Sequence, residues 1–146
     1  MTTINQLLQS KGYQVWTVAP EETVFAALEL MAEKNIGALP VVEHGRVCGI
    51  FSERDYARKV ILHGRSSHYT PIRDIMTAPV FTIRPDEDMN RCMSLMTDKH
   101  VRHLPVLDDD EQLLGIISIG DVVKAIIAEQ QMLINHLENY ITGSRG

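Results

Sequence analysis

The sequence has few cysteines and no long apolar run, and each shortage argues against a class of protein. Two cysteines are too few for the disulfide framework of a small secreted domain and do not form a spaced zinc-ligand set. No stretch approaches the roughly 18 consecutive apolar residues of a membrane span. The first residues also lack the basic and then apolar layout of a secretory signal. We therefore expect a cytoplasmic protein without a membrane segment.

Basic residues are also scarce, because 14 lysines and arginines stand against 19 acidic residues and give a formal net charge of -5. Nucleic-acid backbones are bound chiefly by clustered lysine and arginine, so a broad nucleic-acid surface is not expected. The basic series over 54–65 is interrupted by acidic residues, and we interpret it as a solvated helix face. A local basic cluster can still hold a small anion. With 146 residues, 45% of them hydrophobic, the chain has the balance of one globular domain.

The residue types of enzymes and metal sites do not form a convincing set. Cys48 and Cys92 lie in apolar patterns, where burial raises the thiol pKa and keeps the sulfur unreactive. His100 and His103 have a spacing that two metal ligands could use, but the predicted helix ends there and no third ligand accompanies them. No acid and base pair stands out either. We expect neither a bound metal nor catalysis.

An internal repeat is the strongest pattern in the sequence. Sliding the chain so that Val15 falls on Val80 aligns two long stretches, and one extra residue in the polar loop at 108–111 then brings Asp55 onto Asp121. A fixed period whose single insertion lies in a polar loop indicates two copies of one supersecondary unit.

Each copy predicts the order strand, helix, strand, strand, helix. A β-branched run ending before Pro20 indicates the first strand, and apolar residues three and four apart indicate the helix that follows. Two apolar runs around a His44-Gly45 turn then predict a strand pair. The predicted strands are 15–18, 39–42, 47–51, 80–83, 103–107 and 113–117, and the predicted helices are 23–34, from 52, 88–100 and from 120.

Each copy has roughly 60 residues, and we expect it to bury too little surface to be stable alone. We therefore expect an α/β (α+β) fold in which two βαββα repeats, residues 1–66 and 67–146, pack with pseudo-twofold symmetry. A lead-in helix precedes each copy, at 4–8 and 72–76. This packing creates two related clefts at the seam.

Both copies place a serine and an aspartate, three residues apart, across the predicted strand-to-helix turn after a glycine. These are Ser52 and Asp55 in the first copy and Ser118 and Asp121 in the second. A serine at a helix start lies near unpaired N–H groups and the positive end of the helix dipole, which suits a phosphate oxygen. The aspartate can accept hydrogen bonds from both hydroxyls of a ribose, and the glycine lets a ligand approach the backbone. The alternative is a capping box, which is the interpretation favoured for one such motif by itself. Its recurrence in both copies, together with the resemblance described next, favours a ligand site.

On these motifs the sequence resembles the tandem CBS-domain family, or Bateman modules, from about residue 12 to residue 127. It looks closest to the stand-alone CBS-pair proteins, because of the stretch at 51–60. The resemblance implies a regulatory sensor that binds an adenine nucleotide between its repeats and catalyses nothing. AMP is the favoured ligand, with ATP, NAD or another adenosyl compound as alternatives. The output would pass through an unidentified regulated protein or through assembly.

The resemblance also implies a set of binding residues. In each copy the isoleucine would flank adenine, the serine would contact phosphate and the aspartate would bind ribose, while Arg102 and His103 would be phosphate ligands. The first copy has Gly37 and Ala38 at the positions of these two basic residues, so the clefts are expected to differ. The nucleotide-binding set comprises Ile50, Ser52, Arg54, Asp55, Val80, Arg102, His103, Ile116, Ser118 and Asp121.

The last predicted helix carries an apolar stripe, from Val123 to Ile141, that is longer than the repeat requires. One alternative is that this stripe folds back on the lead-in helix at 4–8. The other is a homodimer interface, which the disc-shaped dimers of the family favour. The rival to the sensor hypothesis is a structural dimerisation module whose clefts bind nothing.

Overall fold

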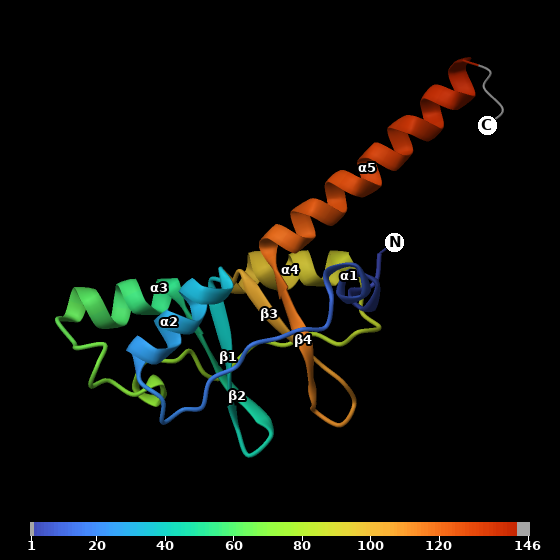
Figure 1. Cartoon of the computed structure of the whole chain (residues 1–146). Coiled ribbons are helices and arrows are strands. Elements are labelled where there is room, and N and C mark those ends of the chain that lie inside the picture. Colours follow the sequence, from blue (N-terminus) through green and yellow to red (C-terminus); the bar gives the residue numbers. More distant parts are fainter. Residues whose placement is uncertain (1, 143–146) are drawn as a thin grey trace.

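The computed structural model describes residues 2–142 and contains two units, each built on a two-stranded antiparallel sheet (Figure 1). The first unit holds β1 and β2, and the second holds β3 and β4. The elements are α1 (Ile4–Lys11), α2 (Val24–Lys34), β1 (Ala38–Glu43), β2 (Arg46–Ser52), α3 (Glu53–Asp55), α4 (Met89–Lys99), β3 (His103–Leu107), β4 (Leu113–Ser118) and α5 (Ile119–Thr142). Short turns of π-helix and 3-10 helix continue α3 over Tyr56–Val60 and Ile61–His63, and a 3-10 turn spans Ile72–Asp74.

The expected strands at 15–18 and 80–83 are wrong as strands, because each segment contributes only one bridge residue. Val18 pairs in parallel with Val41, and Ile83 pairs in parallel with Val106. A proline follows each segment within two residues and has no N–H to continue a ladder. The other predicted strands and the helices α2, α4 and α5 are confirmed to within a few residues.

The two sheets have the same register, which confirms the repeat in three dimensions. Val41 faces Gly49 in the first sheet, Val106 faces Gly115 in the second, and each ladder is shifted directly after that pair. Consequently the serine that ends β2 and the serine that ends β4 occupy equivalent positions, each opposite the first residue of its partner strand.

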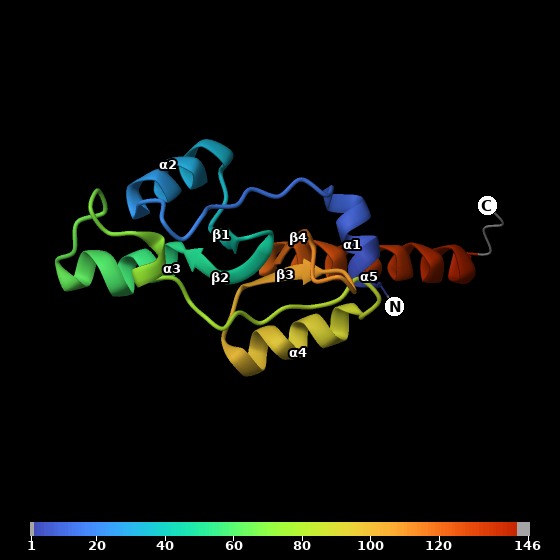
Figure 2. The ribbon, with the colours of Figure 1, turned by 90° about the horizontal axis from the view of Figure 1, so that it is seen from below.

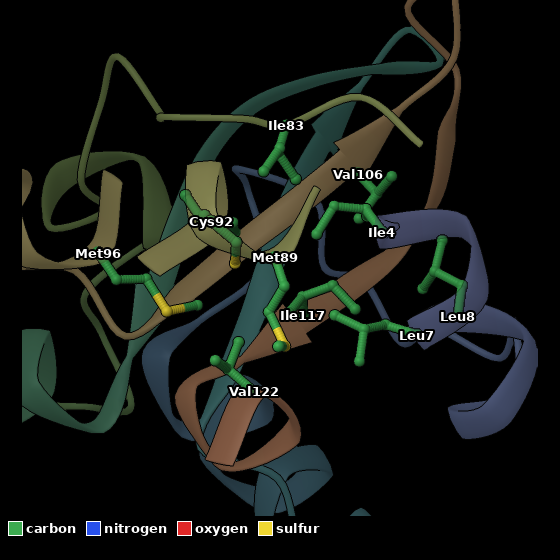
Figure 3. Close-up of a cluster of buried hydrophobic side chains, with 11 residues drawn as sticks. Ile4, Leu7, Leu8, Ile83, Met89, Cys92, Met96, Val106, Ile117 and Val122 are labelled. Carbon is green, nitrogen blue, oxygen red and sulfur yellow. The ribbon is translucent and has the colours of Figure 1, made fainter. Parts of the chain in front are cut away.

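The lead-in segments are exchanged between the two cores. Ile4, Leu7 and Leu8 of α1 pack into the core of the second repeat, against residues such as Ile83 and Ile117 (Figure 3). Ile72 and Ile75 pack in turn into the core of the first repeat. In Figure 2 the connection after α1 crosses from the second repeat to α2 of the first. Each core is therefore completed by the lead-in segment that precedes the other repeat in the sequence.

The long helix α5 leaves the body of the protein after its first turns (Figure 1). Val122 is buried in the second core, whereas every described residue from Gln130 onward is exposed. The alternative in which the apolar stripe folds back on α1 is therefore wrong for residues 130–142. Although α5 has 24 residues, no helix within the described part of the chain is long and apolar enough to cross a membrane.

Candidate functional site

A cavity of about 700 Å³ lies between the two repeats. Its size falls within the range of about 300–1,000 Å³ that is typical of small-molecule sites. Both repeats contribute to the wall, so a molecule bound there would touch both. Seven predicted site residues line it: Ile50, Ser52, Arg54, Asp55, Val80, Arg102 and His103.

The first serine–aspartate turn forms where β2 ends and α3 begins. The Ser52 hydroxyl accepts a hydrogen bond from the backbone N–H of Asp55, at 3.2 Å, and Oδ2 of Asp55 accepts one from the backbone N–H of Ser52, at 3.0 Å. The capping box considered for this turn is therefore present. Oδ2 of Asp55 also accepts a hydrogen bond from the Ser52 hydroxyl, at 3.1 Å, so the turn uses both acceptor positions of this oxygen.

Two residues outside the predicted set hold the Asp55 side chain in place. Lys59 Nζ lies 3.0 Å from Oδ1 of Asp55, and the hydroxyl of Thr77 donates to the same oxygen at 2.9 Å. Lys59 also donates to the backbone carbonyl of Ile75, at 3.2 Å. These contacts fix the orientation of a carboxylate that is itself buried. The spacing of Lys59, four residues after Asp55, is a signal that sequence reasoning could have used.

The segment that follows Ile75 is held against β2 by backbone hydrogen bonds. Ile50 and Thr77 exchange two, at 3.0 and 2.8 Å. A Cβ atom added at Gly49 would lie 2.6 Å from Sδ of Met76, so this glycine allows the segment to approach the strand. That differs from the expectation that it admits a ligand. The bridge places Val80 and Phe81 at the cavity, beside Ile50.

Basic side chains from both repeats also line the cavity. Arg54 and Arg58 come from the first repeat, and Lys99 and Arg102 come from the second. His103 lines the same cavity, and burial together with the charges of Lys11 and Arg102 lowers its pKa, although Asp121 opposes them. A neutral imidazole is therefore favoured at His103, and the permanent positive charge is carried by the arginines and lysines.

The second serine–aspartate turn does not line this cavity. Oδ2 of Asp121 accepts hydrogen bonds from the backbone and the hydroxyl of Ser118, at 2.8 and 2.9 Å, as in the first repeat. Here, however, Lys11 Nζ reaches across from α1 and lies 2.6 Å from Oδ2 of Asp121 and 2.6 Å from the carbonyl oxygen of Ile116. Thus Ile116, Ser118 and Asp121 do not line the cavity that the other seven predicted residues line.

The charge of Asp121 is stabilised in this arrangement. Burial raises its pKa, but the hydrogen bonds from Lys11 and Ser118 outweigh burial, so the pKa of Asp121 is lowered overall. Both aspartates therefore carry a lysine partner, Lys59 or Lys11, and the two turns differ in that only Asp55 lines the cavity between the repeats. The expectation of unequal clefts therefore gains a geometric basis.

Neither Cys48 nor Cys92 lines the cavity between the repeats. Burial raises the pKa of Cys92 to about 11, and burial together with Glu43 raises the pKa of Cys48, which agrees with the expected rise of the thiol pKa. Among residues 2–142, no three or more histidine, cysteine or acidic residues are grouped so that they could hold a metal ion.

Comparison with known proteins agrees with the repeat. The family model described as CBS domain matches residues 11–62 and again residues 72–128. The chain belongs to the CBS-domain family. Its two matched regions are the two repeats, so it is a CBS pair of the regulatory kind.

Three CBS relatives illustrate the similarity. The CBS domain-containing protein CBSX3, mitochondrial, of Arabidopsis thaliana is 41% identical over 152 residues, covering 97% of this chain and 73% of the relative. A signal-transduction protein with CBS domains from Burkholderia ambifaria superposes with a TM-score of 0.84 and 49% identity, covering 88% of this chain and 96% of the other. The structure of CBSX2 in complex with AMP superposes with a TM-score of 0.71 and 26% identity, covering 89% and 99% of the two chains.

None of these three CBS proteins is named for an enzymatic activity. CBSX3 is named as mitochondrial, so a cytoplasmic location stays a prediction for this chain. AMP is the ligand of one of the three, and it is the ligand that the sequence analysis favoured.

Proposed function

We propose that this CBS pair binds an adenine nucleotide in the cavity between its repeats and acts as a sensor without catalytic activity. The supporting observation is that one cavity brings Ile50, Ser52 and Asp55 of the first repeat together with Arg102 and His103 of the second. The AMP complex of CBSX2 supports the choice of an adenine nucleotide, with ATP and NAD as alternatives.

The chemistry of the cavity suits the three parts of a nucleotide. Ile50, Val80 and Phe81 offer an apolar surface for the flat face of adenine. The carboxylate of Asp55 can accept hydrogen bonds from the ribose hydroxyls when these replace Thr77 and Lys59 as donors to Oδ1. Arginine side chains, among them Arg102, attract the phosphate and can bind it through two hydrogen bonds at once.

We infer that one nucleotide binds per chain, in the cleft of the first repeat. In the second repeat, Lys11 occupies both the carboxylate of Asp121 and the carbonyl of Ile116. The residues opposite that turn by repeat equivalence, Gly37 and Ala38, supply no positive charge for a phosphate.

In this proposal the nucleotide signals by shifting the equilibrium between different relative orientations of the two repeats. A nucleotide that touches both repeats favours the relative orientation in which both sets of contacts form, and an unidentified partner protein reads that orientation. The ligand can shift this equilibrium only by its difference in affinity for the two orientations.

A screen of ligands tests nucleotide binding. Thermal unfolding of the ligand-free chain is followed with AMP, ADP, ATP, NAD and S-adenosylmethionine, and with GMP as the matched purine control. A ligand at about 100 times its dissociation constant should add about 2.7 kcal/mol to the free energy of unfolding. Unchanged unfolding with every adenine compound, and no heat in calorimetry, would instead support a structural dimerisation module.

The exposed part of α5 supports a second proposal, that two copies form a homodimer. Leu133, Ile134, Leu137 and Ile141 are exposed and recur at helical spacing on a segment that has left the body of its own chain. A Leu133→Glu, Leu137→Glu double variant should be a folded monomer in light scattering, whereas the unaltered chain should be a dimer. A dimer that persists in the double variant would place the interface elsewhere.

A further inference from the structure

The arginines differ in whether they have a carboxylate partner, and the difference follows their location. Among the eight arginines within residues 2–142, four form ion pairs with carboxylates: Arg65, Arg73, Arg84 and Arg91. The other four have no carboxylate partner in this part of the chain. Three of those four, Arg54, Arg58 and Arg102, line the cavity between the repeats, and Arg46 lies outside it.

The three unpaired guanidinium groups approach the cavity from both repeats. Arg54 and Arg58 are four residues apart in the helical segment after β2, so they point from one side of it. Arg102 precedes β3 in the other repeat, and Lys99 at the end of α4 adds a further positive charge. Arg54 already donates to the backbone carbonyl of His100, at 3.1 Å, across the seam.

Acidic side chains do not balance this charge. The carboxylates that line the cavity are those of Glu53 and Asp55. Asp55 is already bound by Lys59 and Thr77, which leaves Glu53 beside three arginines and Lys99. In a chain with a net charge of -5, this local positive excess is a feature that an anionic ligand would neutralise.

The size of that excess bears on how many phosphates the ligand carries. A single phosphate bears about 1.5 to 2 negative charges near neutral pH and is matched by one or two guanidinium groups. The positive charge of three arginines and a lysine exceeds what one phosphate neutralises, so it matches an anion with more than one phosphate. We propose that the cavity selects an adenine nucleotide with two or three consecutive phosphates, ADP or ATP, over AMP. This inference rests on the proposed function and deepens it.

In this arrangement Arg54 and Arg58 of the first repeat and Arg102 of the second bind the phosphates, and Arg58 adds its contact when a second phosphate is present. Because these residues come from different repeats, the outer phosphates add contacts that cross the seam. The protein would then distinguish the phosphorylation state of the nucleotide, and not only its presence. NAD differs from ADP and ATP because its diphosphate has no free terminal phosphate.

Calorimetric titration of the full chain with AMP, ADP and ATP, without divalent cations, tests the proposal. We expect ATP and ADP to bind at least about tenfold more tightly than AMP. The ratio of their affinities to that of AMP should fall as the salt concentration rises, because salt screens the phosphate contacts. In Arg58→Gln the ratio of ATP affinity to AMP affinity should fall about tenfold, the loss of one charge-assisted hydrogen bond. Arg46→Gln is the matched control, because Arg46 donates to the carbonyl of Asp110 outside the cavity and should leave the ratio unchanged.

The outcomes separate the two proposals. AMP that binds as tightly as ATP, or an Arg58→Gln variant with an unaltered affinity ratio, overturns the selection for consecutive phosphates while nucleotide binding stands. Failure of all three nucleotides to bind overturns the proposed function itself. Arg58 is exposed, so Arg58→Gln should unfold at the temperature of the unaltered chain, which circular dichroism checks before titration.

Discussion

The two clefts of this protein contain the same turn but differ in what reaches its aspartate. Asp55 is held by Lys59 from its own helix and by Thr77, and the space beside it stays open as a cavity. Asp121 is held by Lys11, which comes from α1 and also takes a backbone carbonyl on β4. The comparison teaches that a serine–aspartate turn is a local structure, whereas its availability to a ligand depends on the segment packed beside it.

The cause of the difference lies in the two lead-in segments. The helix α1 is regular over eight residues, begins with a capping box at Thr3, and carries Lys11 in its last turn. Its counterpart is a single 3-10 turn, Ile72–Asp74, after which the chain is extended enough for Thr77 to pair with Ile50. In the repeat alignment Lys11 corresponds to Met76, whose sulfur packs over Gly49. A lysine thus meets the aspartate in one cleft, and a methionine lies beside the strand in the other.

The largest expected effect comes from exchanging the two aspartates for alanine, one at a time. Asp55→Ala should weaken nucleotide binding by about 30-fold or more, because it removes a charged acceptor for two ribose hydroxyls. Asp121→Ala should change the affinity by less than about threefold, since Asp121 does not line the cavity between the repeats. Calorimetry on both variants measures the difference.

The two variants control for each other, because each loses the same capping interaction at a helix start. An equal loss of affinity in both would mean that the two clefts are used alike. If neither variant lost affinity, the serine–aspartate turns would be capping structures only.

A smaller effect is expected from Lys11→Met, which gives the second cleft the residue found at the equivalent position of the first. The change leaves Asp121 and the carbonyl of Ile116 without this partner, so the free energy of unfolding at pH 7 should fall by about 1 to 2 kcal/mol. Nucleotide affinity at the cavity should change by less than about threefold, because Lys11 does not line it and acts there only on the pKa of His103. Urea denaturation and calorimetry measure the two quantities.

The effect of Lys11→Met should depend on pH. Because the pKa of Asp121 is lowered in the folded chain, its contribution is fully present above the unfolded value of about 3.9 and is lost as the pH falls through the folded value. The difference in stability between Lys11→Met and the unaltered chain should therefore shrink below about pH 4. A difference that stays constant from pH 7 to pH 3 would show that Lys11 acts through packing and not through this ion pair.

Sequence reasoning predicted those elements whose signals are local. The strand pair around His44-Gly45 formed as expected, because its turn and its apolar runs are adjacent in the chain. The segment at 15–18 did not form a strand. Its single bridge, from Val18 to Val41, depends on the tertiary position of β1, which a local pattern does not contain. The apolar stripe from Val123 onward predicted the helix α5. It did not predict that α5 extends away from the two repeats.

The site was predicted in part for the same reason. The residues of the turn at the end of β2 were recognised, and the structure brings them together with Arg102 and His103. Lys11 and Thr77 were missed, because they lie far along the chain from the aspartates that they contact. No periodicity or motif marks such a contact in a single sequence.

The sequence by itself determined that there are two repeats and that each ends a strand with a capped serine–aspartate turn, because those hydrogen bonds join residues at most four positions apart. Only the tertiary structure decided which turn opens onto a cavity. That choice depends on the exchange of the lead-in segments between the two cores, since a lysine on α1 reaches the second aspartate only when α1 packs against the distant repeat.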